Sequence, residues 1–140
     1  MLSDIIVHIA KTNGLSEDIS RKALGIVLNA AERQDTPFAG SMFRTVPGAR
    51  DLSARTGHEL GVPTGTLARL IEQTPGGKRH VARWMITSLH ALDLDHKAIG
   101  RLLPAIADYM QQTHGLDGFG HLGDLIGADL DAAMAETKAA

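Results

Sequence analysis

The chain contains no cysteine. This absence excludes disulfide bonds, thiolate zinc sites, iron–sulfur clusters and a cysteine nucleophile, and it is consistent with a reducing compartment. No apolar run approaches the ~18 residues that a membrane-spanning helix needs. An acid, Asp4, stands where a signal peptide would carry a basic flank. We therefore expect a cytoplasmic protein without a membrane span.

A strong charge of one sign is also lacking. The formal net charge is −2 at pH 7, which gives no general argument for binding to nucleic acid or to a membrane surface. A length of 140 residues predicts a single domain over 1–140, built around one hydrophobic core.

The sequence predicts an all-α fold. Apolar residues recur every three or four positions, and only Ile5–Val7 has the composition of a strand. Helix caps and breakers place the helices at about 4–12, 16–33, 37–44, 48–55, 65–73, 78–92, from Asp95 past Met110, and 129–137. The segment 56–63 is expected to be a linker. The expected core comprises Ile19, Ile26, Leu70, Val81, Met85, Leu89, Ile99, Leu103 and Ile106, with Trp84 beside them.

Two stretches of the chain share a spacing of apolar residues. Segments 14–52 and 94–130 both have a capped helix with apolar residues four, three and four apart, followed by a turn that contains phenylalanine. This pattern is compatible with two pseudo-repeated helical units joined by a central helical segment, and also with chance similarity between amphipathic helices. Pro104 would take the place of Leu24, and a proline inside a helix predicts a kink there.

One cluster of residues has the composition of a metal site. His114, Asp117, His121 and Asp124 are spaced three, four and three apart, so a continuous helix would align their side chains as ligands of a hard metal. The glycines between them disfavour such a helix. We therefore expect polar turn residues without a bound metal, and metal-assisted hydrolysis is the least favoured reading.

A second cluster could bind an anion. Gly76 and Gly77 precede Lys78 and Arg79 at an expected helix start, where free amides and the helix dipole favour negative charge, and Arg83 lies one turn further on. The segment is not a P-loop, because the first glycine, the hydroxyl residue and the preceding strand of that motif are missing. Gly77, Lys78, Arg79 and Arg83 are thus candidates for contact with phosphate or a nucleic-acid backbone.

No residues are found for catalysis. His58 and Glu59 are adjacent on an expected loop, where they have no defined mutual geometry for acid–base chemistry. The serines lack a glycine-flanked nucleophile elbow. We expect no enzymatic activity and no cofactor.

The first third of the chain resembles a group of known proteins. Gly14–Ser16, Ala23–Leu28 and Val46–Ala49 together look like the small bacterial helical proteins of unknown function of the VcgC/VcgE type and the YidB-like type. The resemblance implies a compact all-α fold and supplies no functional residues. We therefore expect a non-enzymatic domain that associates with a protein partner or with itself, with nucleic-acid contact through Lys78, Arg79 and Arg83 as the alternative.

Overall fold

Seven α-helices and no β-strand make up residues 2–115, the part of the chain that the computed structural model describes. In chain order they are α1 (Leu2–Asn13), α2 (Glu17–Arg33), α3 (Pro37–Thr45), α4 (Ala49–Glu59), α5 (Thr66–Glu72), α6 (Pro75–His90) and α7 (His96–His114). The predicted all-α fold is confirmed. Among residues 2–115 we find no helix that could span a membrane.

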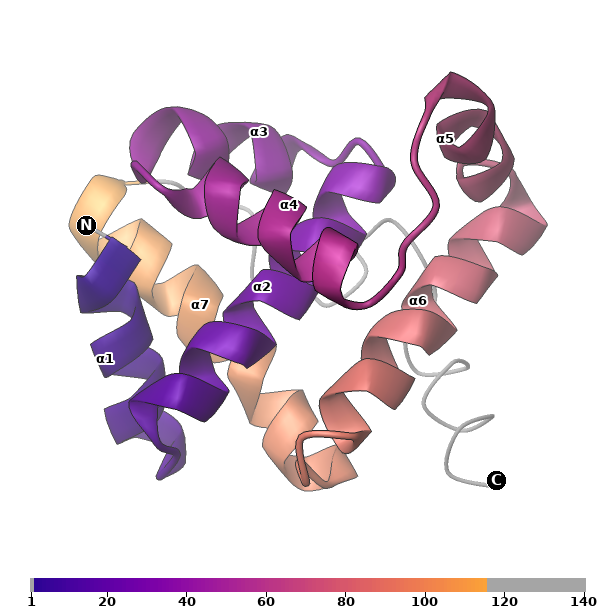
Figure 1. Ribbon diagram of the computed structural model, residues 1–140. Helices are drawn as coiled ribbons and strands as arrows, with labels where there is room; N and C mark the ends of the chain where they lie inside the picture. Colours follow the sequence, from indigo (N-terminus) through magenta and orange to yellow (C-terminus); the bar gives the residue numbers. More distant parts are fainter. Residues whose placement is uncertain (1, 116–140) are drawn as a thin grey trace.

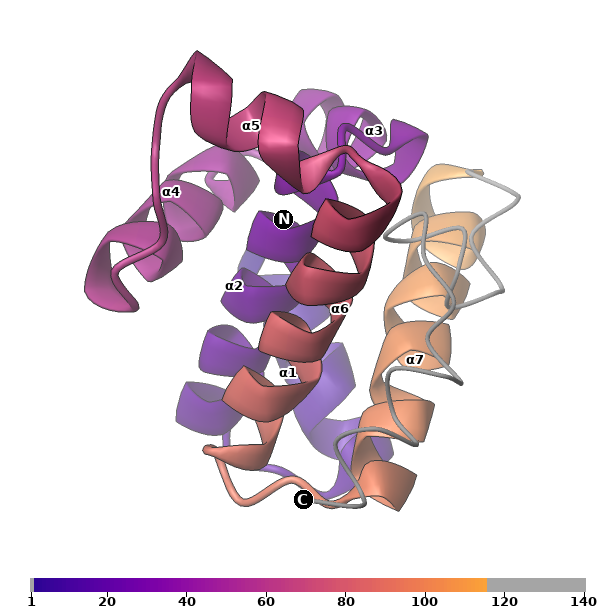
Figure 2. The same cartoon turned by 90° about the vertical axis from the view of Figure 1, so that its right-hand side faces the viewer.

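Helix α2 is the centre of the packing. It contacts α1, α3, α4 and α6, and Figure 1 shows it crossing the middle of the molecule between α1 and α6. Its Leu24, Val27 and Leu28 have no solvent exposure. Helix α7 packs mainly on α1, and α5 lies at the end of the molecule where α6 begins (Figure 2).

Several helix starts follow from side-chain caps that the sequence predicted. The Ser16 hydroxyl accepts a hydrogen bond from the Ile19 amide at 3.1 Å, and the Asp95 carboxylate accepts one from the Ala98 amide at 2.7 Å. These bonds satisfy amides that have no partner within the first turn of a helix. Pro37 occupies the first turn of α3, as expected.

Two predicted boundaries are wrong. Helix α4 continues to Glu59 and includes half of the segment predicted as a linker, although Gly57 lowers its helix propensity. Close packing on α2 favours glycine at this position, because a Cβ atom there would lie only 2.7 Å from the side-chain nitrogen of Asn29. This packing keeps residue 57 within the helix despite its low helix propensity. Helix α6 begins at Pro75 rather than Lys78, because the Thr74 hydroxyl caps it and proline suits the first turn.

The predicted core is largely confirmed. Ile26, Val81, Met85, Leu89, Ile99, Leu103 and Ile106 are buried, while Ile19 and Trp84 are half-buried against the core. Leu70 is the error, since 61% of its surface is exposed. It lies on the short α5, whose buried residue is instead the acid Glu72.

The predicted duplication is not tested by the described residues. Pro104 lies inside α7, as the sequence requires, but the second unit, 94–130, extends beyond residue 115. The last predicted helix, 129–137, also lies outside the described residues. The duplication and the kink at Pro104 therefore stay predictions.

Helices α2 and α4 cross closely because glycine occupies the contact. A Cβ atom on Gly25 would lie 2.1 Å from the Thr56 hydroxyl oxygen of α4, which is far inside van der Waals contact. The close approach therefore depends on the absence of a side chain.

We predict that Gly25→Ala lowers the free energy of unfolding by about 1–3 kcal/mol, because the added methyl group forces the two helices apart. Gly100→Ala is the matched control, since a Cβ atom there meets nothing within 4 Å. That control should raise stability by up to about 1 kcal/mol, because alanine favours a helix over glycine. Urea denaturation of both variants measures the difference, and equal stabilities would contradict the prediction.

Candidate functional site

Gly77 of the predicted anion site has a packing role. A Cβ atom on Gly77 would lie 2.0 Å from the Ile71 carbonyl oxygen and 2.6 Å from the Cα atom of Glu72. Gly77 thus lets α6 begin directly against the end of α5. Its amide donates to the Thr74 hydroxyl at 3.1 Å, and the Lys78 amide donates to the Thr74 carbonyl oxygen at 2.8 Å. Two amides expected to face an anion are therefore already bonded within the helix cap.

The cations of that site lie along the first half of α6. Lys78 is half-buried, and Arg79 and Arg83 are exposed one turn apart on the same side of the helix. The structure therefore brings the positive charges together, but the Gly77 and Lys78 amides beside them are not free to bind an anion. Anion binding by these residues stays a prediction.

The predicted metal cluster is only partly described. His114 is the last residue of α7, and Asp117, His121 and Asp124 lie outside the described residues. Within residues 2–115 no group of three or more histidines and acids could hold a metal ion. His58 and Glu59 lie exposed at the end of α4 rather than in a loop.

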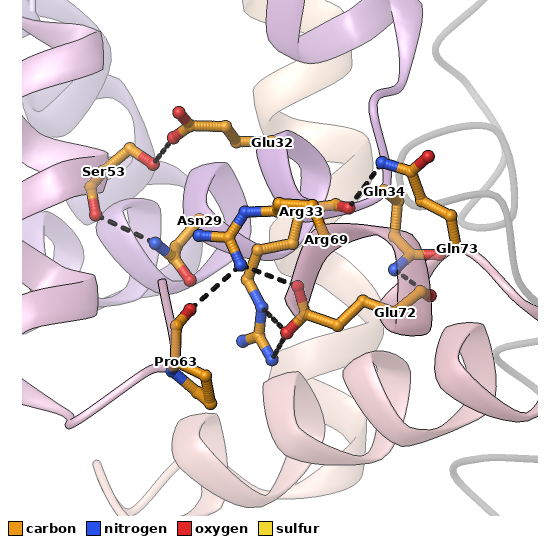
Figure 3. A network of polar contacts seen from close by, with 9 residues as sticks. All are labelled: Asn29, Glu32, Arg33, Gln34, Ser53, Pro63, Arg69, Glu72 and Gln73. Carbon is orange, nitrogen blue, oxygen red and sulfur yellow. Dashed lines mark hydrogen bonds and ion pairs between the residues drawn. The ribbon is translucent and has the colours of Figure 1, made fainter. Parts of the chain in front are cut away.

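A buried ion pair that the sequence did not predict joins α2 to α5. Arg33, the last residue of α2, is only 2% exposed, and its Nε donates to Oε2 of Glu72 at 2.7 Å (Figure 3). Its Nη2 contacts the same carboxylate oxygen. The guanidinium also lies over the Trp84 ring of α6, 4.6 Å from the ring centroid. Three helices therefore meet at one arginine.

Further hydrogen bonds fix the position of α5. The Arg69 Nη1 donates to Oε1 of Glu72 at 2.7 Å and to the Pro63 carbonyl oxygen at 3.0 Å. The Gln34 side-chain amide donates to the Glu72 carbonyl oxygen at 2.9 Å. Both carboxylate oxygens of Glu72 are thus bonded to arginine, and these contacts attach both α5 and the preceding loop to α2.

The other side of α5 is apolar and exposed. Leu67, Leu70 and Ile71 are 72%, 61% and 57% exposed. Their spacing of three and one places them on one face of the helix, and we call these three residues the α5 apolar face. Leu60, in the turn after α4, is 48% exposed. The sequence did not indicate this exposed surface, because apolar residues at i, i+3 and i+4 are also typical of a helix face that packs on the core.

We predict that Glu72→Gln lowers the free energy of unfolding by about 3–5 kcal/mol, because Arg33 keeps its buried charge and loses its counterion. The amides of α5 should lose protection from hydrogen exchange first, since Glu72 is what attaches this helix to α2.

Arg55→Gln is the control for this prediction. Arg55 pairs with Asp51 at 3.8 Å on the surface of α4, and both side chains are largely exposed. Loss of such a pair should change stability by less than about 1 kcal/mol. Thermal denaturation compares the two variants, and an equal effect would show that the buried pair does not hold α5.

Comparison with known proteins gives no support for a family or an activity. No family model matches the chain, and no match was found among curated proteins or solved structures. The resemblance to the VcgC/VcgE and YidB-like proteins therefore stays an expectation, and the function is proposed from the described residues alone.

Proposed function

We propose that this chain is a non-enzymatic helical domain that works by association with a protein partner or with a second copy of itself, and that the α5 apolar face is the contact. The observation that carries the proposal is the exposure of Leu67, Leu70 and Ile71 on a helix that buried charges hold in place.

The exposure of this face has an energetic cost. Burying a leucine or isoleucine side chain contributes about 1.5–3 kcal/mol relative to leaving it in water. Three such side chains on one face of the seven-residue α5 stay exposed and do not contribute this free energy to folding. Helices α2 and α6 of the same chain bury their apolar residues. Contiguous exposed apolar surface in a water-soluble domain is typical of a contact site for another molecule.

The buried polar contacts of α5 support the same proposal. A buried ion pair adds little stability compared with apolar side chains of similar size, because both charges lose their hydration. What Arg33 and Glu72 do provide is a defined position for α5. A helix that is already ordered loses less conformational entropy when it binds, so its apolar face is prepared for a partner.

The shape of the contact limits the kind of partner. Helix α5 is a convex element at the end of the molecule, so the complementary surface has to be an apolar groove that receives side chains at positions i, i+3 and i+4. Standard interfaces bury about 800 Å² on each side. The three side chains would therefore form the centre of a contact that also includes neighbouring surface.

The alternative function is contact with phosphate or a nucleic-acid backbone through Lys78, Arg79 and Arg83. It is less well supported, because the Gly77 and Lys78 amides are bonded within the α6 cap. Metal-assisted hydrolysis has the least support, since His114 is the one member of its residue set within residues 2–115.

We predict that the double variant Leu67→Ser, Leu70→Ser weakens association by at least about tenfold, because each lost leucine removes apolar area from the centre of the contact. Its folding stability should change little, since both side chains are exposed. Sedimentation velocity over a range of protein concentrations measures self-association, and a pull-down from the native cell extract measures association with a partner.

The matched control is Lys78→Ala, Arg79→Ala, which removes two cations of the alternative site and leaves the α5 apolar face intact. This control should associate as the unchanged chain does. The proposal is wrong if the leucine variant and the unchanged chain behave identically in both measurements, or if the control variant alone loses its partner.

A further inference from the structure

Positive side chains gather along the first half of α6. Arg79 and Arg83 are exposed one turn apart, and the half-buried Lys78 precedes them. We call these three residues the α6 cation cluster. Among residues 2–115, Lys78 and Arg79 form no ion pair. The described part of the chain therefore leaves at least two charges of this cluster without a counterion.

The chain around the cluster is poor in acids. From residue 60 to residue 92 the sequence contains a single acid, Glu72. Its side chain is buried, and its two carboxylate oxygens bond to Arg33 and Arg69. Helices α5 and α6 therefore supply no carboxylate of their own to the cluster. Because neighbouring cations repel one another, the cluster favours a negatively charged group from elsewhere.

Acids are concentrated in the segment that follows α7. Residues 116–140 contain five acids and one base, which gives a formal charge of −4. They are Asp117, Asp124, Asp129, Asp131, Glu136 and the base Lys138. The rest of the chain holds 13 of the 14 bases and 11 of the 16 acids, which gives +2. The two parts of the chain are therefore opposite in charge.

The acidic segment is long enough to reach the cluster. It follows α7 directly, and α7 contacts α6 beyond the turn that joins these two helices (Figure 2). Placed end to end, α6, α7 and the turn would span about 70 Å. A stretch as long as residues 116–140 extends to about 80 Å. Every part of α6 therefore lies within its reach.

We propose that the acidic segment 116–140 binds the α6 cation cluster of the same chain through contacts between its carboxylates and Lys78, Arg79 and Arg83. A tethered segment has an effective concentration on the order of 1 mM, so contacts that are too weak to hold a free peptide suffice here. The segment thereby covers the surface on which phosphate or nucleic-acid contact would depend. The α5 apolar face is not involved.

Other occupants fit the cluster less well. Phosphate groups bind best where free backbone amides accompany the cations, whereas the Gly77 and Lys78 amides are bonded within the α6 cap. A formal charge of +2 on the rest of the chain is also small for a protein that binds a polyanion. A second copy would bring its own cation cluster, which repels the first.

A spin label on the acidic segment tests the contact. Because the chain has no cysteine, Ala132→Cys gives a single site for a nitroxide on the ¹⁵N-labelled full chain. We expect the nitroxide to broaden the amide signals of Lys78, Arg79 and Arg83 relative to the reduced label. In 1 M NaCl this broadening should fall by about half or more, because the Debye length decreases from about 10 Å at 0.1 M salt to about 3 Å.

Two variants of the labelled chain make the assignment specific. Lys78→Glu, Arg79→Glu should abolish the broadening, and acids in the first turn of α6 suit its helix dipole, so the fold is kept. Arg21→Glu, Lys22→Glu, at two exposed positions of α2, changes the charge equally and should leave the broadening unchanged. A melting temperature for each variant verifies that it is folded.

Two further measurements separate the possible occupants. In a mixture of ¹⁵N-labelled chain without the nitroxide and spin-labelled chain without ¹⁵N, we expect no broadening, because the contact lies within one chain. A 20-base-pair DNA duplex should shift the cluster amides only weakly. The proposal is overturned if the broadening is absent or independent of salt, if the α2 variant loses it as well, if it arises in the mixture, or if DNA shifts these amides while the nitroxide leaves them sharp.

Discussion

The buried ion pair between Arg33 and Glu72 attaches α5, and with it the exposed α5 apolar face, to the central helix α2. Helix α5 has seven residues, which is too short to be stable alone, and its apolar residues face solvent rather than the core. Its position therefore depends on Glu72, whose two carboxylate oxygens bond to Arg33 of α2 and to Arg69. The position of the α5 apolar face follows from this attachment.

The middle and the C-terminal end of α2 have different roles. Its middle is apolar and forms the centre of the core, with Leu24, Val27 and Leu28 fully buried. Its last turn and a half carries Asn29 and Glu32, which both bond to Ser53 of α4, and Arg33, which bonds to Glu72 of α5. Since removing either partner of a buried polar contact is costly, such groups favour one arrangement of the surrounding helices over others.

Close packing and polar contacts depend on each other at the crossing of α2 and α4. Gly25 and Gly57 let the two helices approach, and that approach brings the Ser53 carbonyl oxygen within reach of the Asn29 side chain. Glycines that are unfavourable within a helix are thus part of what brings the polar groups of α2 and α4 within hydrogen-bond distance.

The sequence by itself determined the features that depend on neighbouring residues. Ser16 and Asp95 predicted where two helices begin, and the spacing of Val81, Met85 and Leu89 predicted the buried side of α6, because a cap and a helical stripe involve residues within one or two turns. Tertiary structure alone decided the rest. Arg33 and Glu72 are 39 positions apart, so no local pattern indicates that they pair. Leu70 has the spacing of a core residue and Gly57 the propensity of a loop, yet packing between helices exposes the first and keeps the second helical, since burial depends on which elements meet in space.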